Sequence, residues 1–196
     1  MSYQTAVRVL TLETIAVSQL WKLETLQDID VAAGVLYHTI CSGGNIFVTG
    51  VGKSSFIAGK MAATLASFSI PAFYLDPHNA FHGDMGCMKP RDMLVAISKS
   101  GANQEICMLA ARCPTVGITA NENSDLARLS KRVVRVFCPV EADVHEVAPT
   151  ASTTSFMVVC DMIAVCLQEM TGLSIKQFME CHPGGALGKV LREGAR

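Results

Sequence analysis

The sequence predicts an α/β fold in which a doubly wound, five-stranded parallel sheet is flanked by helices. Short apolar runs of strand length alternate along the chain with longer segments whose apolar residues recur every three or four positions, as in helices. This alternation favours a parallel sheet that is covered on both faces. In such a sheet, ligands bind beyond the carboxyl ends of the strands, so the loops that follow the strands are the expected place for a site.

The apolar runs place five strands, and the periodic segments place the helices. The strands are expected at residues 45–49, 71–75, 93–97, 115–119 and 133–138. Helices are expected near residues 3–20 and 28–41, at 56–68, at 103–112, in a short turn before the last strand, and from about residue 155 onward. The stretch 76–90 has no clear period, and a loop of that length in a compact domain is usually functional.

Length and composition predict one domain covering residues 1–196. Half of the residues are hydrophobic and 17% are charged, which is enough to bury one sizeable core. The formal net charge of -1 offers no basic surface, so we expect no nucleic-acid partner. The first residues do not form the apolar core of a signal peptide, and the longest apolar stretch, 156–167, is too short to cross a bilayer. We therefore expect a cytoplasmic protein that does not associate with membranes.

The eight cysteines are scattered along the chain and include no Cys-x-x-Cys pair. In a cytosolic chain, we expect most of them to be small buried hydrophobic residues that stay reduced. The sequence assigns none of them a catalytic or metal-binding role.

The first glycine-rich loop, 50–55, reads Gly-Val-Gly-Lys-Ser-Ser. A nucleotide-binding P-loop needs a glycine five residues before Gly52, where this chain has Phe47. A dinucleotide fingerprint, with Asp76 as the ribose acid, would need a glycine in place of Ser55. Both nucleotide interpretations are therefore weak.

The second loop, 98–103, reads Ser-Lys-Ser-Gly-Ala-Asn and precedes a predicted helix. Hydroxyls and a flexible glycine at a helix start can surround a phosphate, because the unpaired N–H groups and the helix dipole favour an anion. A serine-rich turn with a helix cap explains the loop equally well. A second hydroxyl cluster, at residues 150–154, makes phosphate binding the better interpretation.

Five strings resemble the sugar isomerase (SIS) domain of the arabinose 5-phosphate isomerase family. They are GVGKS, HGDMG, AISKSG followed by Glu105, APTASTT and HPGGALG, in this order, and they cover nearly the whole chain. The last string is the most specific, since many sugar isomerase domains have a serine-rich loop but few end in this way. The resemblance implies a flavodoxin-like sandwich and homotetramers whose sites draw on neighbouring subunits.

The resemblance also implies an activity and the residues that carry it. Members of the family interconvert D-arabinose 5-phosphate and D-ribulose 5-phosphate and so supply Kdo biosynthesis for lipopolysaccharide or capsule. The family's catalytic positions fall on Lys53, Glu105, Glu141 and His182. Its substrate-binding positions fall on Ser54, His82, Ser98, Ser100, Gly101, Asn103, Thr150 and Ser152. The implied site needs no cofactor and no metal.

The chemistry of the reaction fits these residue types. Aldose–ketose conversion moves a proton between C1 and C2 through an enediol, so it needs a base near both carbons and a proton donor for the oxygens. A carboxylate such as Glu105 or Glu141 and a histidine such as His182 can serve in these roles. Lys53 can neutralise charge on the enediolate or on the phosphate.

Each of these residues also has an ordinary structural interpretation. Glu105 could simply favour the dipole of its helix, and Glu141 could be an exposed loop charge. Lys53 could be a solvated surface lysine. His82 could be a loop histidine bonded to backbone, and His182 a turn residue whose ring packs against the chain.

The chain departs from the family pattern at several places. Lys99 replaces a usual asparagine, Ala102 a usual glutamate, and Asn103 a usual serine or threonine, but Lys99 adds positive charge and phosphate binding is expected to survive. The region around Glu141 resembles the family least, and Glu146 is an alternative acid there. Many relatives continue into a pair of CBS modules, so we expect no regulation through such modules here.

Two other functions and one metal site remain open. His78 and His82, with Asp76 and Asp84, have the composition of a divalent metal site, although a loop imposes no fixed ligand spacing. A non-catalytic sugar-phosphate sensor is the alternative function. A nicotinamide-dependent dehydrogenase is a third hypothesis, based only on the first glycine loop.

Overall fold

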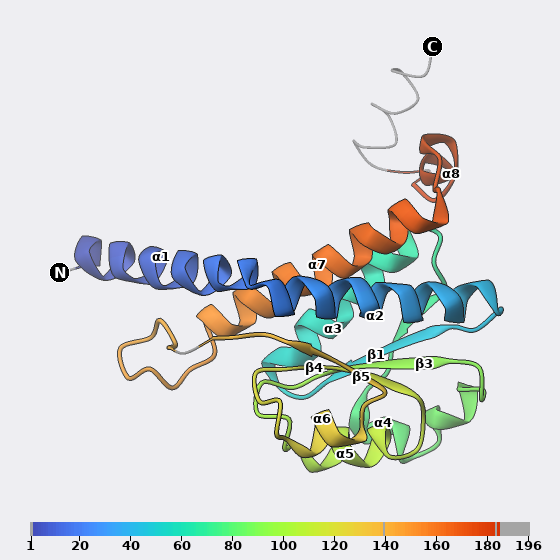
Figure 1. Ribbon diagram of the computed structural model, residues 1–196, viewed down its shortest axis with the longest axis horizontal. Coiled ribbons are helices and arrows are strands. Elements are labelled where there is room, and N and C mark those ends of the chain that lie inside the picture. The colour runs from blue at the N-terminus through green and yellow to red at the C-terminus, as the bar shows by residue number, and fades with distance from the viewer. Residues whose placement is uncertain (1, 139, 183, 185–196) are drawn as a thin grey trace.

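The computed structural model describes residues 2–138, 140–182 and 184, and it confirms the α/β prediction (Figure 1). Within those residues, one sheet has the strand order β2-β1-β3-β4-β5, and all neighbouring strands run parallel. Its strands are β1 (Ile46–Gly50), β2 (Ala72–Tyr74), β3 (Met93–Ile97), β4 (Thr115–Thr119) and β5 (Arg132–Arg135). Because all strands are parallel, their carboxyl ends and the loops that follow lie at one edge of the sheet.

Helices cover both faces of this sheet. One face carries α2 (Leu23–Cys41), α3 (Lys53–Ser67) and α7 (Ala151–Thr171), and the other carries α4 (Pro77–Ala80), α5 (Gln104–Ala110) and α6 (Asp125–Leu129) (Figure 1). The remaining helices are α1 (Ser2–Ser18), which projects from the body, α8 (Ile175–Glu180), and the 3-10 turns η1 (Gln19–Trp21) and η2 (Asp84–Cys87).

The central strands are apolar throughout because both of their faces are buried. In β1, Ile46 and Val48 pack into the core formed with α2, α3 and α7, whereas Phe47 between them packs into the core formed with α5. All residues of β1, β3 and β4 are buried, as expected for a parallel sheet between two helical layers. The sheet therefore exposes loops, rather than strand faces, to a ligand.

The strand order fixes where these loops meet. After β1 the chain turns to β2 on one side, and it then crosses to β3 on the other, so β1 and β3 flank the point where the order reverses. Gly50, the last residue of β1, is in register with Ile97, the last residue of β3. The two polar loops singled out in the sequence thus begin side by side, at the type of position where such sheets bind ligands.

Several local boundaries differ from the sequence predictions. Helix α2 begins at Leu23 rather than near 28, because the turn η1 links it closely to α1. Strand β5 ends at Arg135. The stretch 76–90 contains α4 and η2, and the Asp76 carboxylate caps α4 by accepting hydrogen bonds from the backbone N–H groups of His78 (3.0 Å) and Asn79 (2.9 Å). Asp76 therefore has a structural role.

Helix α7 is long and apolar enough to cross a membrane by length and composition alone. However, it packs against α1, α2 and α3, and residues such as Phe156, Val159 and Ile163 are buried in the core. These contacts identify α7 as a core helix. The eight cysteines are unpaired, but only Cys138 and Cys160 are buried, so the prediction that most of them are buried is wrong.

Candidate active site

The first loop begins helix α3 immediately above the end of β1. A Cβ atom on Gly50 would lie 2.6 Å from the backbone oxygen of Ser54, so only glycine permits this close approach. Gly52 has a φ of 60° and is the N-cap of α3. As a result, Lys53 and Ser54 form the first turn of α3 at the carboxyl edge of the sheet, and Lys53 is exposed to solvent.

A small cavity of about 90 Å³ lies between this turn and the start of α7. Its lining residues are Val51, Lys53, Ser54, Ile57, Lys99, Pro149, Ser152, Thr153 and Phe156. The lining includes two lysines and several hydroxyls but no carboxylate, so the cavity favours an anion. Typical small-molecule pockets measure roughly 300–1,000 Å³. The cavity can therefore hold one end of a sugar phosphate, and the remainder of the substrate needs further protein surface to enclose it.

The second loop is held in shape by its own side chains. Ser98 is buried, and its hydroxyl donates to Asn103 Oδ1 at 2.6 Å while accepting from the N–H of Gly101 at 3.1 Å. Ser100 is exposed, and its hydroxyl accepts from the N–H of Ala102 at 3.3 Å. Ser98 thus organises the loop from within, and Ser100 is the serine of this loop that faces solvent.

Glu141 lies beneath the cavity in a dense set of hydrogen bonds. Its side chain is only 2% exposed, so the interpretation as an exposed loop charge is wrong. One carboxylate oxygen accepts from Lys99 Nζ and from the hydroxyl of Ser152. The other accepts from the backbone N–H groups of Thr150 at 2.9 Å and Ser152 at 3.1 Å. Glu141 therefore joins the second loop to the start of α7.

These contacts hold Glu141 in its ionised form. Burial by itself would raise the pKa of this carboxyl group. The hydrogen bonds from Lys99, from the Ser152 hydroxyl and from the two backbone N–H groups outweigh burial and lower the pKa to about 2. At neutral pH, Glu141 is therefore a permanent anion.

A second buried carboxylate, Asp92, shows the contrast between the two edges of the sheet. It is 1% exposed at the amino end of β3, and it accepts from the backbone N–H groups of Asn45 at 2.8 Å and Lys89 at 2.7 Å. Those contacts join the loops that lead into β1 and β3. Asp92 thus closes the structure at the amino edge, whereas Glu141 at the carboxyl edge is paired with a lysine that lines a cavity.

Glu105 has the opposite environment. It is the second residue of α5 and is exposed, directly after the second loop. Within the part of the chain that the structure describes, no hydrogen bond or ion pair engages its carboxylate. Its oxygens are therefore accessible to a ligand.

The two predicted site histidines lie apart from this cluster. His82 is exposed in the turn after α4, where its ring lies 4.8 Å from that of His78. His182 follows α8, stacks on Phe178 at 4.1 Å, and its Nδ1 lies 2.7 Å from the Phe178 carbonyl oxygen. Helix α8 is at the other end of the 21-residue helix α7 from Ser152 (Figure 1), a span of about 30 Å. One chain therefore does not bring His182 to the cavity.

The structure also bears on the alternative acid Glu146 and on the metal-site hypothesis. Glu146 is exposed, in a turn where Asp143 accepts from the N–H groups of Val147 (2.7 Å) and Ala148 (2.9 Å), so Glu141 is the acid beside the cavity. Among residues 2–138, 140–182 and 184, no group of three metal-ligating side chains lies close enough together to hold a metal ion. The string HPGGALG lies outside the described residues beyond His182 and Gly184.

Lys99 lines the cavity, although it is not among the site residues predicted from the sequence. Its positive charge in the second loop is visible in the sequence, but its contact with Glu141 joins residues 42 positions apart. One signal in the sequence could have indicated the contact. Lys99 and the region around Glu141 both depart from the family pattern. The same limitation applies to Phe156 and Ile57, which form apolar walls of the cavity but look like ordinary core residues in the sequence.

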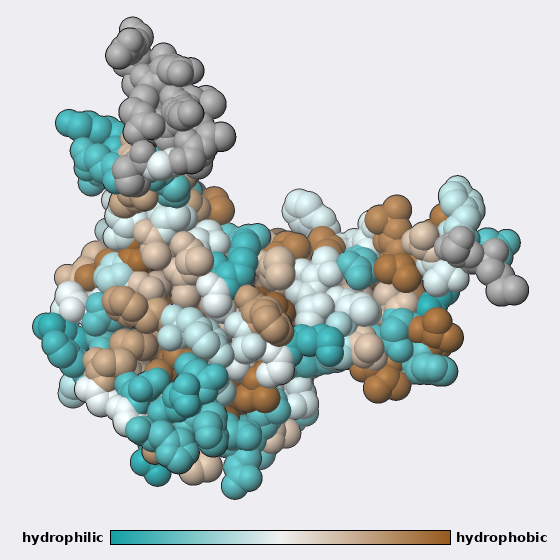
Figure 2. Space-filling view, turned by 180° about the vertical axis from the view of Figure 1, so that it is seen from behind, coloured by the Kyte–Doolittle hydropathy of each residue, from teal (hydrophilic) through white to brown (hydrophobic). Residues whose placement is uncertain are grey.

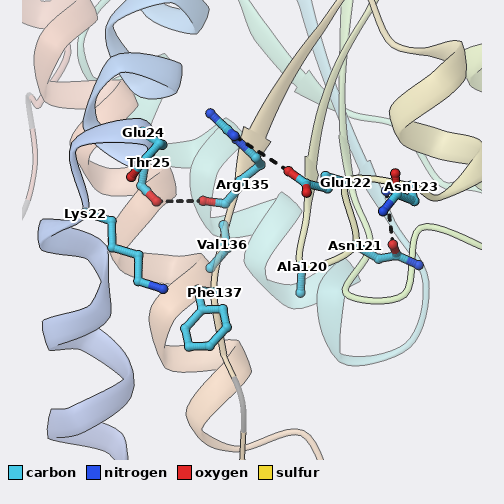
Figure 3. A pocket seen from close by; sticks show the side chains of 10 residues that line it. All are labelled: Lys22, Glu24, Thr25, Ala120, Asn121, Glu122, Asn123, Arg135, Val136 and Phe137. Atoms are coloured by element: carbon cyan, nitrogen blue, oxygen red, sulfur yellow. Dashed lines mark hydrogen bonds and ion pairs between the residues drawn. The ribbon is translucent and has the colours of Figure 1, made fainter.

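A second pocket, of about 720 Å³, lies beyond the ends of β4 and β5 next to the start of α2 (Figure 3). It contains none of the predicted site residues. Unlike the small cavity, it is lined by two carboxylates, Glu24 and Glu122, and Arg135 lies 3.6 Å from Glu122. It is therefore less suited to a phosphate than the cavity between α3 and α7.

Comparison with known proteins assigns the chain to a family. The profile of the SIS domain matches residues 39–166, which is more than half of the chain. The chain belongs to the SIS domain family. The matched range includes every candidate site residue except His182.

Relatives of this SIS domain include enzymes of known name. The arabinose 5-phosphate isomerase KdsD of Francisella tularensis is 42% identical over 151 residues, covering 74% of this chain and 46% of that protein. The chain spans about half the length of the curated relatives it matches.

Solved structures share the fold over nearly the whole chain. A Bacteroides fragilis protein has a TM-score of 0.87 at 28% identity, with 94% of this chain and 99% of that chain covered. The Escherichia coli CFT073 protein c3406, solved in complex with arabinose 5-phosphate, has a TM-score of 0.82 at 28% identity, with 92% and 97% covered.

The shape of the second loop predicts that Gly101→Ala destabilises the protein more than Gly172→Ala does. Both glycines have a φ near +65°, so both variants bear the cost of a left-handed alanine. Only at Gly101 would the new Cβ lie 2.1 Å from the Ser124 hydroxyl, whereas nothing lies within 4 Å at Gly172. We expect an extra loss of about 1–3 kcal/mol in the free energy of unfolding, measured in urea. Equal losses would contradict the proposed packing of the loop.

The pKa of Glu141 predicts how the Glu141→Gln variant responds to pH. The ionised carboxylate stabilises the folded protein fully above pH 4.5, its ordinary pKa, and this contribution disappears as the pH falls toward the folded pKa of about 2. The difference in unfolding free energy between the wild type and Glu141→Gln should therefore be constant near neutrality and shrink below pH 4.5. Urea titrations over this range measure it. A difference that does not change with pH would show that Glu141 is not held ionised.

Proposed function

We propose that this SIS domain is an aldose–ketose isomerase that interconverts D-arabinose 5-phosphate and D-ribulose 5-phosphate through an enediol. The observation that carries the proposal is a cavity with two lysines and no carboxylate on its wall, at the same sheet edge as the open carboxylate of Glu105. The names of relatives such as KdsD, and the arabinose 5-phosphate complex of c3406, support this choice of substrate.

In this proposal, polar groups at the carboxyl edge hold the phosphate. The first turns of α3 and α7 face the cavity, and the positive ends of these long helices favour an anion. Ser54 and Ser152 line the cavity. The other predicted binding residues on this edge are Ser100, Gly101, Asn103 and Thr150, while Ser98 keeps the loop in shape.

We assign the proton transfer between C1 and C2 to Glu105. A base must have an oxygen that can reach the substrate, and the accessible carboxylate of Glu105 meets this requirement. Lys53, exposed beside the cavity, is placed to stabilise the negative charge of the enediolate. The isomerisation moves hydrogen within one molecule, so the proposal includes no redox cofactor.

The complete site is proposed to form between copies of the chain, in a homotetramer. The cavity is too small for a whole substrate, and His182 lies at the far end of α7. The projecting helix α1 exposes apolar side chains, with Leu10 69% and Tyr3 80% exposed, and Figure 2 shows hydrophobic residues along this arm. Assembly would cover these side chains and could bring His82 and His182 of neighbouring copies to the cavity.

The proposed setting follows from the proposed substrate. Arabinose 5-phosphate is a small cytoplasmic metabolite in this scheme, so we propose a cytoplasmic enzyme that supplies Kdo biosynthesis and has no nucleic-acid or membrane partner. The acidic balance of the chain, with a net charge of -1, supports the absence of a nucleic-acid partner.

The first test of this function is turnover by the purified chain and by its Glu105→Gln variant. We expect the wild type to convert arabinose 5-phosphate to the ketose without added nucleotide or metal, and Glu105→Gln to lower kcat by about 10²-fold or more. Glu24→Gln is the matched control, since Glu24 is also an exposed second residue of a helix. It should leave activity unchanged. Phosphate binding without turnover by the wild type would favour the sensor hypothesis instead.

A shared site predicts that two inactive variants restore each other. Oligomers of Glu105→Gln and His182→Gln, mixed under conditions of subunit exchange, should form some sites in which both residues are intact, and activity should return. Mixing Glu105→Gln with Lys53→Met should not restore activity, because these two residues come from the same chain. If exchange is verified by mass spectrometry and the first mixture stays inactive, His182 does not act across an interface.

A further inference from the structure

Lys99 connects two walls of the candidate site. Its backbone oxygen accepts hydrogen bonds from the N–H of Ala120 at 3.1 Å and from the Thr119 hydroxyl at 3.2 Å, which fixes it at the end of β4. Its side chain extends in the other direction and forms an ion pair with Glu141. The position of the ammonium group is therefore determined from both ends.

The ammonium group of Lys99 has donors to spare. A lysine ammonium carries three N–H groups, and within the described residues Glu141 is the only ion-pair partner of Lys99. The Lys99 side chain is 42% exposed and lines the cavity next to Lys53. Lys99 can thus keep its contact with Glu141 and still donate to an anion in the cavity.

Glu141, in contrast, has no place for a substrate. One of its oxygens accepts from Lys99 and the Ser152 hydroxyl, the other accepts from the N–H groups of Thr150 and Ser152, and its side chain is 2% exposed. It does not line the cavity. A sugar could reach its carboxylate only by displacing the bonds that hold the loop and the start of α7 together.

We propose that Lys99 is a substrate-binding residue that contacts the phosphate group, and that Glu141 is a positioning residue that acts through Lys99. The phosphate is the preferred target because Lys99 lies between Ser98 and Ser100 in the loop already assigned to it. The inference rests on the proposed function for the identity of the ligand. It goes further by giving Lys99 a role and by removing Glu141 from proton transfer.

The ion pair between Lys60 and Asp161 provides a matched control. It also joins two elements, α3 and α7, and its side chains are 39% and 44% exposed. Neither residue lines the cavity. Lys60→Met therefore removes a lysine of similar exposure without touching the site.

The experiment measures phosphate affinity and kinetics in Lys99→Met, Lys99→Arg, Glu141→Gln, the double variant Lys99→Met with Glu141→Gln, and Lys60→Met. Circular dichroism and thermal melting establish that each variant is folded. Calorimetry measures binding of inorganic phosphate and of arabinose 5-phosphate to the intact chain, and a coupled assay measures kcat and KM.

The proposal predicts a specific pattern. Lys99→Met should weaken phosphate binding and raise KM about ten-fold or more, with kcat nearly unchanged, and Lys99→Arg should recover most of the affinity. Glu141→Gln should raise KM in the wild-type background and have no further effect in Lys99→Met, since it acts through that residue. Lys60→Met should match the wild type.

Two results would overturn the proposal. One is unchanged phosphate affinity in a folded Lys99→Met variant. The other is a fall of kcat by about 10²-fold or more on Glu141→Gln that persists in the Lys99→Met background, as expected of a proton-transfer group. If the wild type binds phosphate but does not isomerise arabinose 5-phosphate, the proposed isomerase function is wrong. The role of Lys99 in phosphate binding is then still decided by the phosphate affinities of the variants.

Discussion

The parallel register between β1 and β3 is the constraint on which the candidate site depends. Gly50 and Ile97 end their strands opposite each other, so two loops rich in polar groups begin side by side. Both faces of these strands are buried under helices, which leaves the carboxyl edge as the place where polar groups can meet a ligand. The positive ends of α3 and α7 meet at the same edge. The architecture therefore concentrates anion-binding groups in one place.

The strands and the two polar loops could be predicted from the sequence, because they depend on short stretches of the chain. Apolar runs of strand length identified each strand to within a few residues, because both faces of the central strands are buried. The strings Gly-Val-Gly-Lys-Ser and Ser-Lys-Ser-Gly marked the loops after β1 and β3 in the sequence. The structure explains their glycines, because Gly50 approaches the backbone of Ser54 closely and Gly101 has a left-handed conformation. Combined with the strand–helix alternation, these local signals were enough to predict the edge at which the site lies.

Contacts between distant segments could not be predicted in the same way. Glu141 lies in a loop between Val140 and Ala142, where polar and apolar residues follow no helix or strand period, so the sequence gives no signal of its burial. Its pairing with Lys99 brings together the loop after β3 and the loop before α7, 42 positions apart in the chain. The distance between His182 and the cavity follows from the length of α7 and the position of α8, which the string around His182 does not encode. Tertiary packing, rather than residue type, decides these points.

A crystal structure of the assembled protein with arabinose 5-phosphate bound tests the account most directly. We expect a phosphate between the second loop and the first turns of α3 and α7, with Lys99 Nζ within hydrogen-bonding distance of a phosphate oxygen and Glu105 next to C1 and C2. We also expect a histidine from a neighbouring copy at the sugar. A phosphate bound instead in the pocket between Lys22 and Arg135, with Glu105 remote from the sugar, would contradict it.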